Sequence, residues 1–247
     1  MPFLLLAVYF HYYMYYKLSN TSDRERLERS FGAFFKHPKL YRPEVVINGH
    51  NESNLPIITS NEPSSINLGI WGILPEFYKD DWAKFQSLTN TLTIDERHIQ
   101  GDLWYKESLE KRRCLILVTG YFTTFLKDGV TYPYHIGLKS GGPFCLAGIY
   151  NVLEDGFITF SLVVGRSSRY IRKFQNLVDC MPIAITENLI DFWLDQTVSL
   201  EEIQYFLSKP SEQKLHADPI AKEIFGQNIS YDSMLERYEY EDLPTDE

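Results

Sequence analysis

The sequence predicts an α+β fold, in which a curled, barrel-like sheet of antiparallel and mixed strands carries helices at its periphery. Short apolar and β-branched runs follow one another between residues 112 and 166, separated by glycine-containing turns. Amphipathic helical patterns lie instead towards the two ends of the chain. With 247 residues and 44% apolar content, the chain is long enough for one sizeable core. We find no internal repeat and no linker that would divide it.

The strands are expected where apolar runs meet turn residues. The first runs are "PEVVING" and "LPIITS", followed by "INLGIWGILP", which Pro75 closes. A buried strand is predicted over residues 114–126 and ends at the turn "KDG". The remaining strands are expected at residues 131–138, 143–150, 156–164 and 181–185.

The helices are expected at positions that offer caps. A residue among Ser19, Asn20, Thr21 and Ser22 is expected to cap the first helix, and Asp23 complements its dipole. Leu27, Phe31 and Phe34 or Phe35 would then share one face. Further helices are expected at residues 106–113, 167–178, 186–194 and 199–208, the last with a capping box of Ser199 and Glu202.

The formal charge of −9 is unfavourable for a protein that binds nucleic acid. The charge is uneven, because residues 232–247 carry seven acidic residues and one arginine and so contribute −6. The other 231 residues therefore carry only −3. We expect a mildly acidic domain at residues 14–230 and a loose acidic tail at 231–247.

The three cysteines are isolated and lack CxxC spacing, which argues against a disulfide framework and a zinc site. This usage favours a reducing cytoplasm. Cys114 and Cys145 lie in apolar runs and are expected to be buried. The six histidines show no metal-binding spacing, so neither a metal nor another cofactor is expected.

The N-terminal residues 1–13 form an extension with an apolar run at 3–10. This run is far shorter than the about 20 residues that span a bilayer, so no membrane partner is expected. Either Met1 or Met14 can be the true start. The extension is then a buried strand or an artefact of start assignment.

Few residues suggest chemistry by themselves. Thr123 and Thr124 place hydroxyls where a strand approaches a turn, although threonine is also a good strand former. Residues 92–99 alternate in charge, as solvated loops do. Residues 165–173 hold the one basic cluster, which suits either anion binding or a solvent-facing helix side.

Several linked motifs, however, resemble the SOS response-associated peptidase (SRAP) family in order and spacing. The similarity covers roughly residues 14–194. Its motifs are "WGILP" at 71–75, "RRCLILVTGYF" at 112–122, "YPY" at 132–134, "LAGIY" at 146–150 and "CMPIAI" at 180–185.

This resemblance implies a specific chemistry. In that family, removal of methionine exposes an N-terminal cysteine, whose amine and thiol trap the aldehyde of an abasic site in single-stranded DNA as a thiazolidine. An asparagine in "NAR.ET" helps to hold the terminus and the DNA. A glutamate in "G(F/Y)(Y/F)EW" and a histidine in "H.RMP" handle protons.

The chain departs from the family at each of these positions. Tyr15 stands at the cysteine, with Tyr13 as the other register, and no cysteine precedes Cys114. Thr93 replaces the asparagine, and Thr123 replaces the glutamate. Gln175 is assigned to the histidine. Threonine and glutamine cannot act as acid or base near neutral pH.

The DNA contacts that the resemblance implies are altered as well. Asp95 stands at the arginine of the asparagine segment, which turns phosphate attraction into repulsion, and Arg97 stands at its glutamate. Trp71 persists, and Arg166 and Arg169 supply positive charge. We expect these five residues to be the DNA-binding candidates.

Three functions remain open at this level. The first is a catalytically inactive SRAP-like scaffold that binds single-stranded DNA or a protein partner. The second is abasic-site processing by a non-cysteine nucleophile, such as the secondary amine of Pro2 after loss of Met1. The third is a decaying copy without a DNA role.

Overall fold

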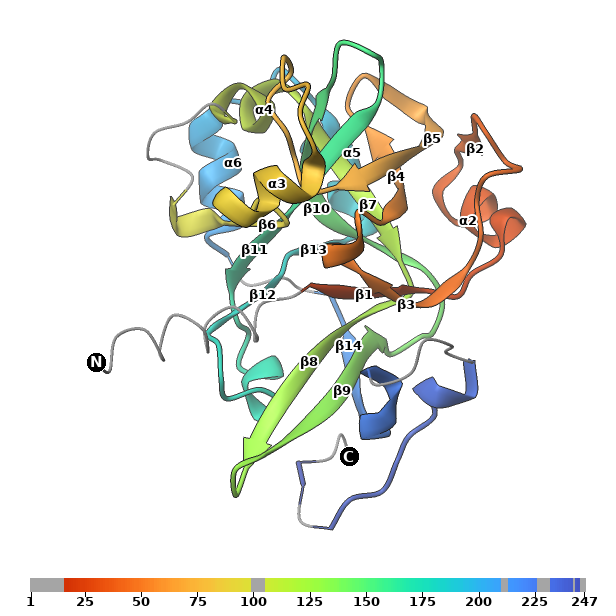
Figure 1. The fold of residues 1–247 in the computed structure, drawn as a ribbon, viewed down its shortest axis with the longest axis vertical. Helices are drawn as coiled ribbons and strands as arrows, with labels where there is room; N and C mark the ends of the chain where they lie inside the picture. The colour runs from red at the N-terminus through yellow and green to blue at the C-terminus, as the bar shows by residue number, and fades with distance from the viewer. Residues whose placement is uncertain (1–15, 99–104, 210–212, 226–231, 242, 245–247) are drawn as a thin grey trace.

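The computed structural model of the protein describes residues 16–98, 105–209, 213–225, 232–241 and 243–244 (Figure 1). The expected extension at residues 1–13 and the Tyr15 position lie outside the described residues. The strands are β1 Lys17–Asn20, β2 Phe34–Phe35, β3 Glu44–Asn48, β4 Asn54–Thr59, β5 Glu62–Trp71, β6 Thr93–Asp95, β7 Arg113–Val118, β8 Gly120–Lys127, β9 Val130–Leu138, β10 Phe144–Val152, β11 Ile158–Arg166, β12 Cys180–Pro182, β13 Ala184–Ile185 and β14 Leu215–Pro219.

The helices are α2 Arg24–Phe31, α3 Trp82–Leu88, α4 Lys106–Lys111, α5 Ile190–Leu194 and α6 Leu200–Leu207. Short 3₁₀ turns are η1 Gly49–Asn51, η2 Glu96–His98, η3 Ile171–Lys173, η4 Glu187–Leu189, η5 Lys222–Phe225 and η6 Asp232–Leu235. The capping box of α6 is confirmed, since the Ser199 side chain accepts from the Glu202 backbone and the Glu202 side chain from the Ser199 backbone. The expected α+β class is confirmed.

A closed barrel forms the centre of the fold. The strands run in the order β5-β4-β7-β10-β11 with antiparallel neighbours, and β11 returns to pair with β5 in parallel. The register of this closing pair joins Thr159 to Ile70 and Phe160 to Trp71. Strands β6 and β12 add to β11, so the same strand supports two further segments. Closure leaves the barrel strands without a free edge at this seam.

A second sheet of five strands has the order β14-β9-β8-β1-β3, with antiparallel pairing throughout. In Figure 1 its long β8–β9 hairpin points away from the barrel, which lies above it. The sequence predicts a single strand over 114–126, but the structure divides it into β7 and β8 at Thr119. Because β7 belongs to the barrel and β8 to the second sheet, the chain passes directly from one sheet to the other at Thr119.

Two expected helices differ from the structure. Helix α2 is capped by Asp23, whose side chain accepts from the Arg26 backbone, because Ser19 and Asn20 already belong to β1. The helix stops at Gly32, which adopts a left-handed φ of 62°, so Phe34 and Phe35 form a strand instead. The expected helix at 167–178 is also wrong, since only η3 forms there.

The core contains the cysteines, as expected. Cys114 and Cys145 are 0% and 2% exposed, which confirms their predicted burial. Cys180 is also buried, at 9%. All three thiols are free.

The acidic tail packs against the second sheet where the structure describes it. Tyr238 and Tyr240 bond to the Pro219 and Ile220 backbone, and Leu243 is buried. The expectation of a loose tail is therefore wrong for residues 232–241 and 243–244. None of the helices in the described ranges has the length and apolar character needed to cross a membrane.

Candidate functional site

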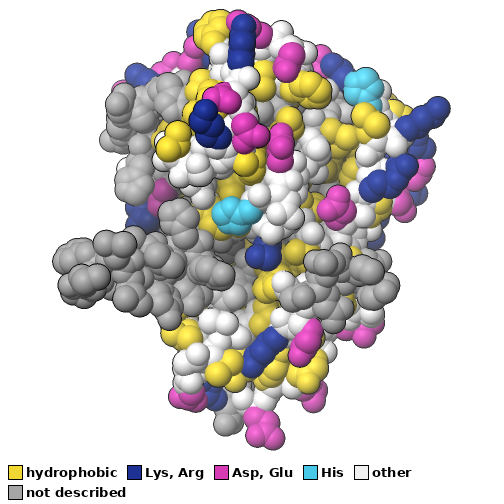
Figure 2. All heavy atoms as spheres, viewed as in Figure 1, with side chains coloured by type: hydrophobic (Ala, Val, Ile, Leu, Met, Phe, Trp, Pro, Cys, Tyr) yellow, Lys and Arg dark blue, Asp and Glu magenta, His cyan; other side chains and the backbone are white. Residues whose placement is uncertain are grey.

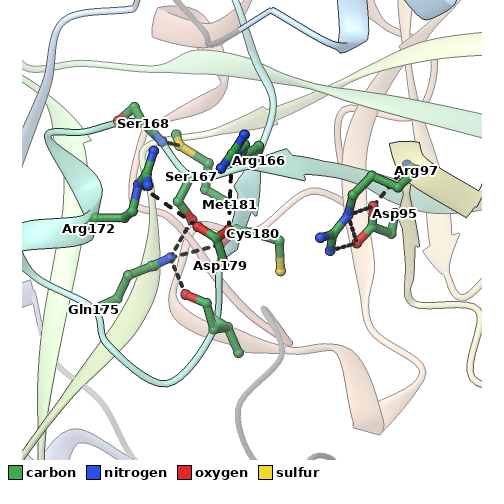
Figure 3. A network of polar contacts seen from close by, with 11 residues as sticks. Asp95, Arg97, Arg166, Ser167, Ser168, Arg172, Gln175, Asp179, Cys180 and Met181 are labelled. Atoms are coloured by element: carbon green, nitrogen blue, oxygen red, sulfur yellow. Dashed lines mark hydrogen bonds and ion pairs between the residues drawn. The ribbon is translucent and has the colours of Figure 1, made fainter.

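Thr123 and Gln175 meet at the centre of the candidate site. Thr123 lies on β8 and is 7% exposed, and its hydroxyl donates to Gln175 Oε1 at 2.8 Å. The Gln175 amide nitrogen donates to Ser167 Oγ at 2.7 Å and to the carbonyls of Val178 and Cys180 at 3.1 and 2.9 Å (Figure 3). Thr123 and Gln175 thus form a buried polar network, and neither of these two side chains is ionisable.

The loop that carries Gln175 is tied to β8 by its neighbour Asn176. The Asn176 side chain accepts from the Leu126 backbone N–H and donates to the Leu126 carbonyl, both at 2.8 Å. These two hydrogen bonds hold the irregular segment around Asn176 against strand β8. In the spacing "H.RMP", counting back from Pro182 reaches Val178, yet Val178 contributes only its carbonyl to this network. The side chain that meets Thr123 is that of Gln175.

Strand β6 brings Thr93 and Asp95 to one side of β11. The parallel pairing sets Thr93 beside Leu162 and Asp95 beside Val164. Because side chains alternate along a strand, Thr93 and Asp95 share a face, and Ile94 packs into a core cluster on the other side. Thr93 is 7% exposed, and its hydroxyl has no hydrogen-bond partner among the residues that the structure describes.

Arg97 folds back on Asp95 and neutralises it. The Arg97 guanidinium donates to the two Asp95 oxygens through Nε at 2.8 Å and Nη2 at 2.5 Å, and its backbone N–H adds a bond at 2.9 Å. The Asp95 carboxylate raises the pKa of Arg97. These two DNA-binding candidates therefore bind each other, which reduces the charge that either presents to a phosphate.

Cys180 lies between the Gln175 network and the Asp95–Arg97 pair (Figure 3). Burial, together with the Asp95 and Asp179 charges, raises the pKa of the Cys180 thiol to about 11, although Arg97 opposes the shift. Burial likewise raises the pKa of Cys145 to about 12 and that of Cys114 still further. The thiols of the chain are therefore protonated at neutral pH and poor nucleophiles.

Tyr16 enters the same region from the residue before β1. It is 5% exposed, and its hydroxyl accepts from Asn90 Nδ2 at 2.9 Å. Burial raises the pKa of Tyr16 to about 12, with the Asn90 bond acting against the shift and Cys180 adding to it. Tyr16 thus presents a neutral phenol in the region of Cys180. No pattern in the sequence predicts the Tyr16–Asn90 contact.

The basic segment 166–173 borders the site on its solvent side. Arg166 and Arg172 each place Nε 3.9 Å from an oxygen of Asp179. Arg169 is exposed. One carboxylate therefore faces two guanidiniums, and the segment retains positive charge. On the face shown in Figure 2, lysine and arginine side chains are interspersed with acidic ones and form no single patch.

Trp71 does not serve as a DNA contact. Its side chain is 0% exposed, and its indole N–H donates to the Leu92 carbonyl at 2.7 Å. The ring stacks on Phe160 across the barrel seam, with centroids 6.4 Å apart. A base cannot reach it, so the expected role of Trp71 is wrong: its conformation serves the closing pair of the barrel.

The other candidates divide into two groups. Gln175, bonded to Thr123, and the Asp95–Arg97 pair lie on either side of Cys180, and Thr93 lies further along β11, beside Leu162. Arg166 and Arg169 lie on the bordering segment. Within the described ranges no group of three or more histidine, cysteine or acidic side chains is arranged to hold a metal ion.

Comparison with known proteins gives a consistent result. A family model described as SOS response associated peptidase (SRAP) matches residues 14–226. An abasic site processing protein of Saccharomyces cerevisiae is 26% identical over 178 residues, which is 70% of this chain and 47% of that protein. The chain thus spans about half the length of this curated relative.

Solved structures share the fold. A protein of Bacteroides thetaiotaomicron superposes with a TM-score of 0.81 at 21% identity, covering 90% of this chain and 99% of that one. A protein of Bordetella bronchiseptica gives 0.69 at 15% identity, covering 83% and 99%. A phage-related protein of the same organism gives 0.61 at 15%, covering 84% and 95%.

Proposed function

The chain belongs to the SOS response associated peptidase (SRAP) family, and from this premise we propose that it is a member that binds single-stranded DNA as a scaffold without crosslinking it. The observation that carries the proposal is the buried hydrogen bond from Thr123 to Gln175. The resemblance assigns Thr123 to a glutamate and Gln175 to a histidine; the strict spacing of "H.RMP" reaches Val178, but Gln175 is the side chain that meets Thr123. Here a hydroxyl and an amide satisfy each other, and neither can transfer a proton near neutral pH.

The thiol chemistry points in the same direction. Thiazolidine formation needs a thiolate next to an amine, and burial raises the pKa of all three cysteines. Tyr16, in the region of Cys180, offers a phenol whose pKa is also raised. These groups hold their protons under the conditions in which an abasic aldehyde must be attacked.

The exposed arginines at the border of the site support non-covalent DNA binding. Arg166 is 71% exposed at its side chain and Arg172 48%, and both share Asp179 as partner. Exposed guanidiniums of this kind bind backbone phosphates irrespective of sequence. The relative from Saccharomyces cerevisiae is named for abasic site processing, which makes DNA the appropriate ligand to test.

The test is incubation of the purified protein with a single-stranded oligonucleotide that contains one abasic site, with and without borohydride, on a denaturing gel. We expect no covalent band in either lane, and a salt-sensitive, non-covalent complex in fluorescence anisotropy. A band without borohydride would reveal an active nucleophile and overturn the proposal. A band that needs borohydride would indicate a Schiff base on an amine. An absence of binding at low salt would favour a protein partner or no DNA role.

A further inference from the structure

Residues 232–241 and 243–244, here called the strap, pass around one edge of the second sheet. At their start, Met234 and Leu235 pack on a small core cluster formed by Val45, Phe122, Ile220 and Ile224. Further along, the Tyr238 backbone N–H donates to the Pro219 carbonyl at 2.7 Å. Figure 1 shows this segment beside β9 and β14 at the lower end of the molecule.

Because side chains alternate along a strand, the residues of the β8–β9 hairpin divide between two faces. Phe122 belongs to the small cluster, so its face is where the strap begins. Thr123 points to the opposite face, and Tyr134 is its direct partner on β9. The Tyr134 hydroxyl donates to the Pro244 carbonyl at 2.7 Å. The strap therefore crosses from one face to the other and ends on the face that carries the candidate site.

The crossing point is an aromatic contact. The Tyr240 ring lies 5.0 Å from that of Tyr132, and its hydroxyl donates to the Ile220 carbonyl at 3.0 Å. Lys222 lies over Tyr132 at 3.9 Å and within 5.5 Å of Tyr240. After the crossing, Leu243 is only 9% exposed. A hydrogen bond at each end of this stretch and a buried leucine hold the strap in one place.

The end of the strap is adjacent to both parts of the site. The Tyr134 ring lies 5.5 Å from that of Phe174, the residue before Gln175, and Phe174 lies 5.1 Å from Tyr170 within the basic segment. A series of contacts thus connects Pro244 with Tyr170, which lies within the basic segment. Of the strap's charged residues, Glu236 and Glu239 precede the crossing at Tyr240, and Arg237 lowers the pKa of Tyr134 against the effect of burial, so the strap covers this side of the site by its volume rather than by its charge.

We propose that the strap is an autoinhibitory segment, which covers the Tyr134 side of the Thr123–Gln175 site and must move before single-stranded DNA binds there. This proposal rests on the DNA-binding function proposed above. Covering acts through the volume of Leu243 and Pro244, which lie on the Tyr134 face.

The test combines the release of the strap with DNA affinity in the full-length chain. Tyr240→Ala with Leu243→Ala removes the ring at the crossing and the buried leucine. As a second variant, Tyr134→Phe removes only the hydroxyl that binds Pro244. Tyr205→Ala is the matched control, since Tyr205 is 65% exposed on α6 and contacts Lys209. Limited proteolysis within the strap and thermal unfolding report on release and on folding.

The affinity for a fluorescein-labelled oligo-dT is measured by anisotropy at several salt concentrations. We expect the double variant to be cleaved faster within the strap and to bind about tenfold more tightly at low salt, with a smaller gain for Tyr134→Phe and none for the control. Equal, measurable affinity in all forms would sink the autoinhibitory role and leave DNA binding intact. Release without DNA binding in any form would instead remove the proposed function, and with it the regulation.

Discussion

The Thr123 hydroxyl and the Gln175 amide oxygen lie 2.8 Å apart across a sequence separation of 52 residues. Thr123→Val removes this buried donor with little change in volume. We expect a loss of about 1 kcal/mol in the free energy of unfolding, the usual net value of one buried hydrogen bond. Urea denaturation measures it, and Thr131→Val, a half-buried threonine on β9, is the control. An unchanged midpoint would mean that the contact adds no stability.

Gln175 is expected to matter more than Thr123, because its amide nitrogen bonds to three oxygens, those of Ser167, Val178 and Cys180. Gln175→Leu should cost about 2–4 kcal/mol by leaving buried acceptors without their donor. The same urea experiment tests this order. If Gln175→Leu proved milder than Thr123→Val, the loop would be held by Asn176 alone.

Arg113 is a buried cation that four backbone carbonyls satisfy. Its guanidinium donates to the carbonyls of Trp193, Leu109, Glu110 and Asp195, at 2.5 to 2.8 Å. Arg113→Met should cost about 3–5 kcal/mol, because these acceptors lose their donor. The melting temperature reports the loss. Arg24, whose side chain is 40% exposed and paired with Glu25 on α2, gives a control substitution that should change the melting temperature little.

His135 makes stability depend on pH. Burial lowers the pKa of His135 from 6.5 to about 4, with Asp218 opposing the shift and His216 adding to it. Since the folded state then binds fewer protons than the unfolded state between these values, stability falls as pH drops from about 6.5 to 4, by about 3 kcal/mol. His135→Phe should flatten this part of the stability curve, whereas a change at the exposed His37 should not. An unchanged slope in His135→Phe would assign the effect to other groups.

The buried thiols predict slow alkylation of the native protein. Because burial raises the pKa of Cys180 to about 11, its reaction with iodoacetamide at pH 7.5 should be far slower than that of a free cysteine. Raising the pH towards 11 should accelerate it. Intact mass spectrometry should find no label in the native state and three labels, one on each cysteine of the chain, in denaturant. Rapid native labelling at Cys180 would reveal an accessible thiolate and weaken the case for an inactive site.

Asp179 is expected to restrain DNA binding, since it lies 3.9 Å from both Arg166 and Arg172. Asp179→Asn should release both guanidiniums and strengthen binding to single-stranded DNA by about threefold to tenfold at low salt, with a steeper salt dependence. Anisotropy titrations measure it. Asp191→Asn on α5 removes the same charge elsewhere, and an equal gain there would reduce the effect to net charge.

The sequence predicted the parts of this fold that local residue patterns determine. Alternating apolar runs located most barrel strands, Ser199 and Glu202 marked a helix start, and apolar neighbours indicated the burial of Cys114 and Cys145. These features depend on residues close in the chain. The helix predicted at 167–178 was wrong for the same reason. Its local spacing is helical, but Gln175 and Asn176 form hydrogen bonds to strand β8, which is distant in the sequence.

The site itself required tertiary information. Motif positions suggested Thr123 and Gln175 as replaced residues, but nothing in the spacing said that they bond to each other. Arg97 looked available for DNA until Asp95 was seen to bind it. Trp71 was a DNA-binding candidate by motif position, although barrel closure buries it. Composition alone predicted a loose tail, because the contacts of Tyr240 and Leu243 form only with the folded sheet.

Strand β11 pairs with β10, β5, β6 and β12 and so holds the segments of Thr93, Asp95 and Cys180 in a common frame. In such a frame, backbone pairing sets the position of a residue independently of the chemical nature of its side chain. Main-chain pairing with β11 sets these backbone positions, so a substitution of similar size can change the chemistry of the site while the strands keep their register.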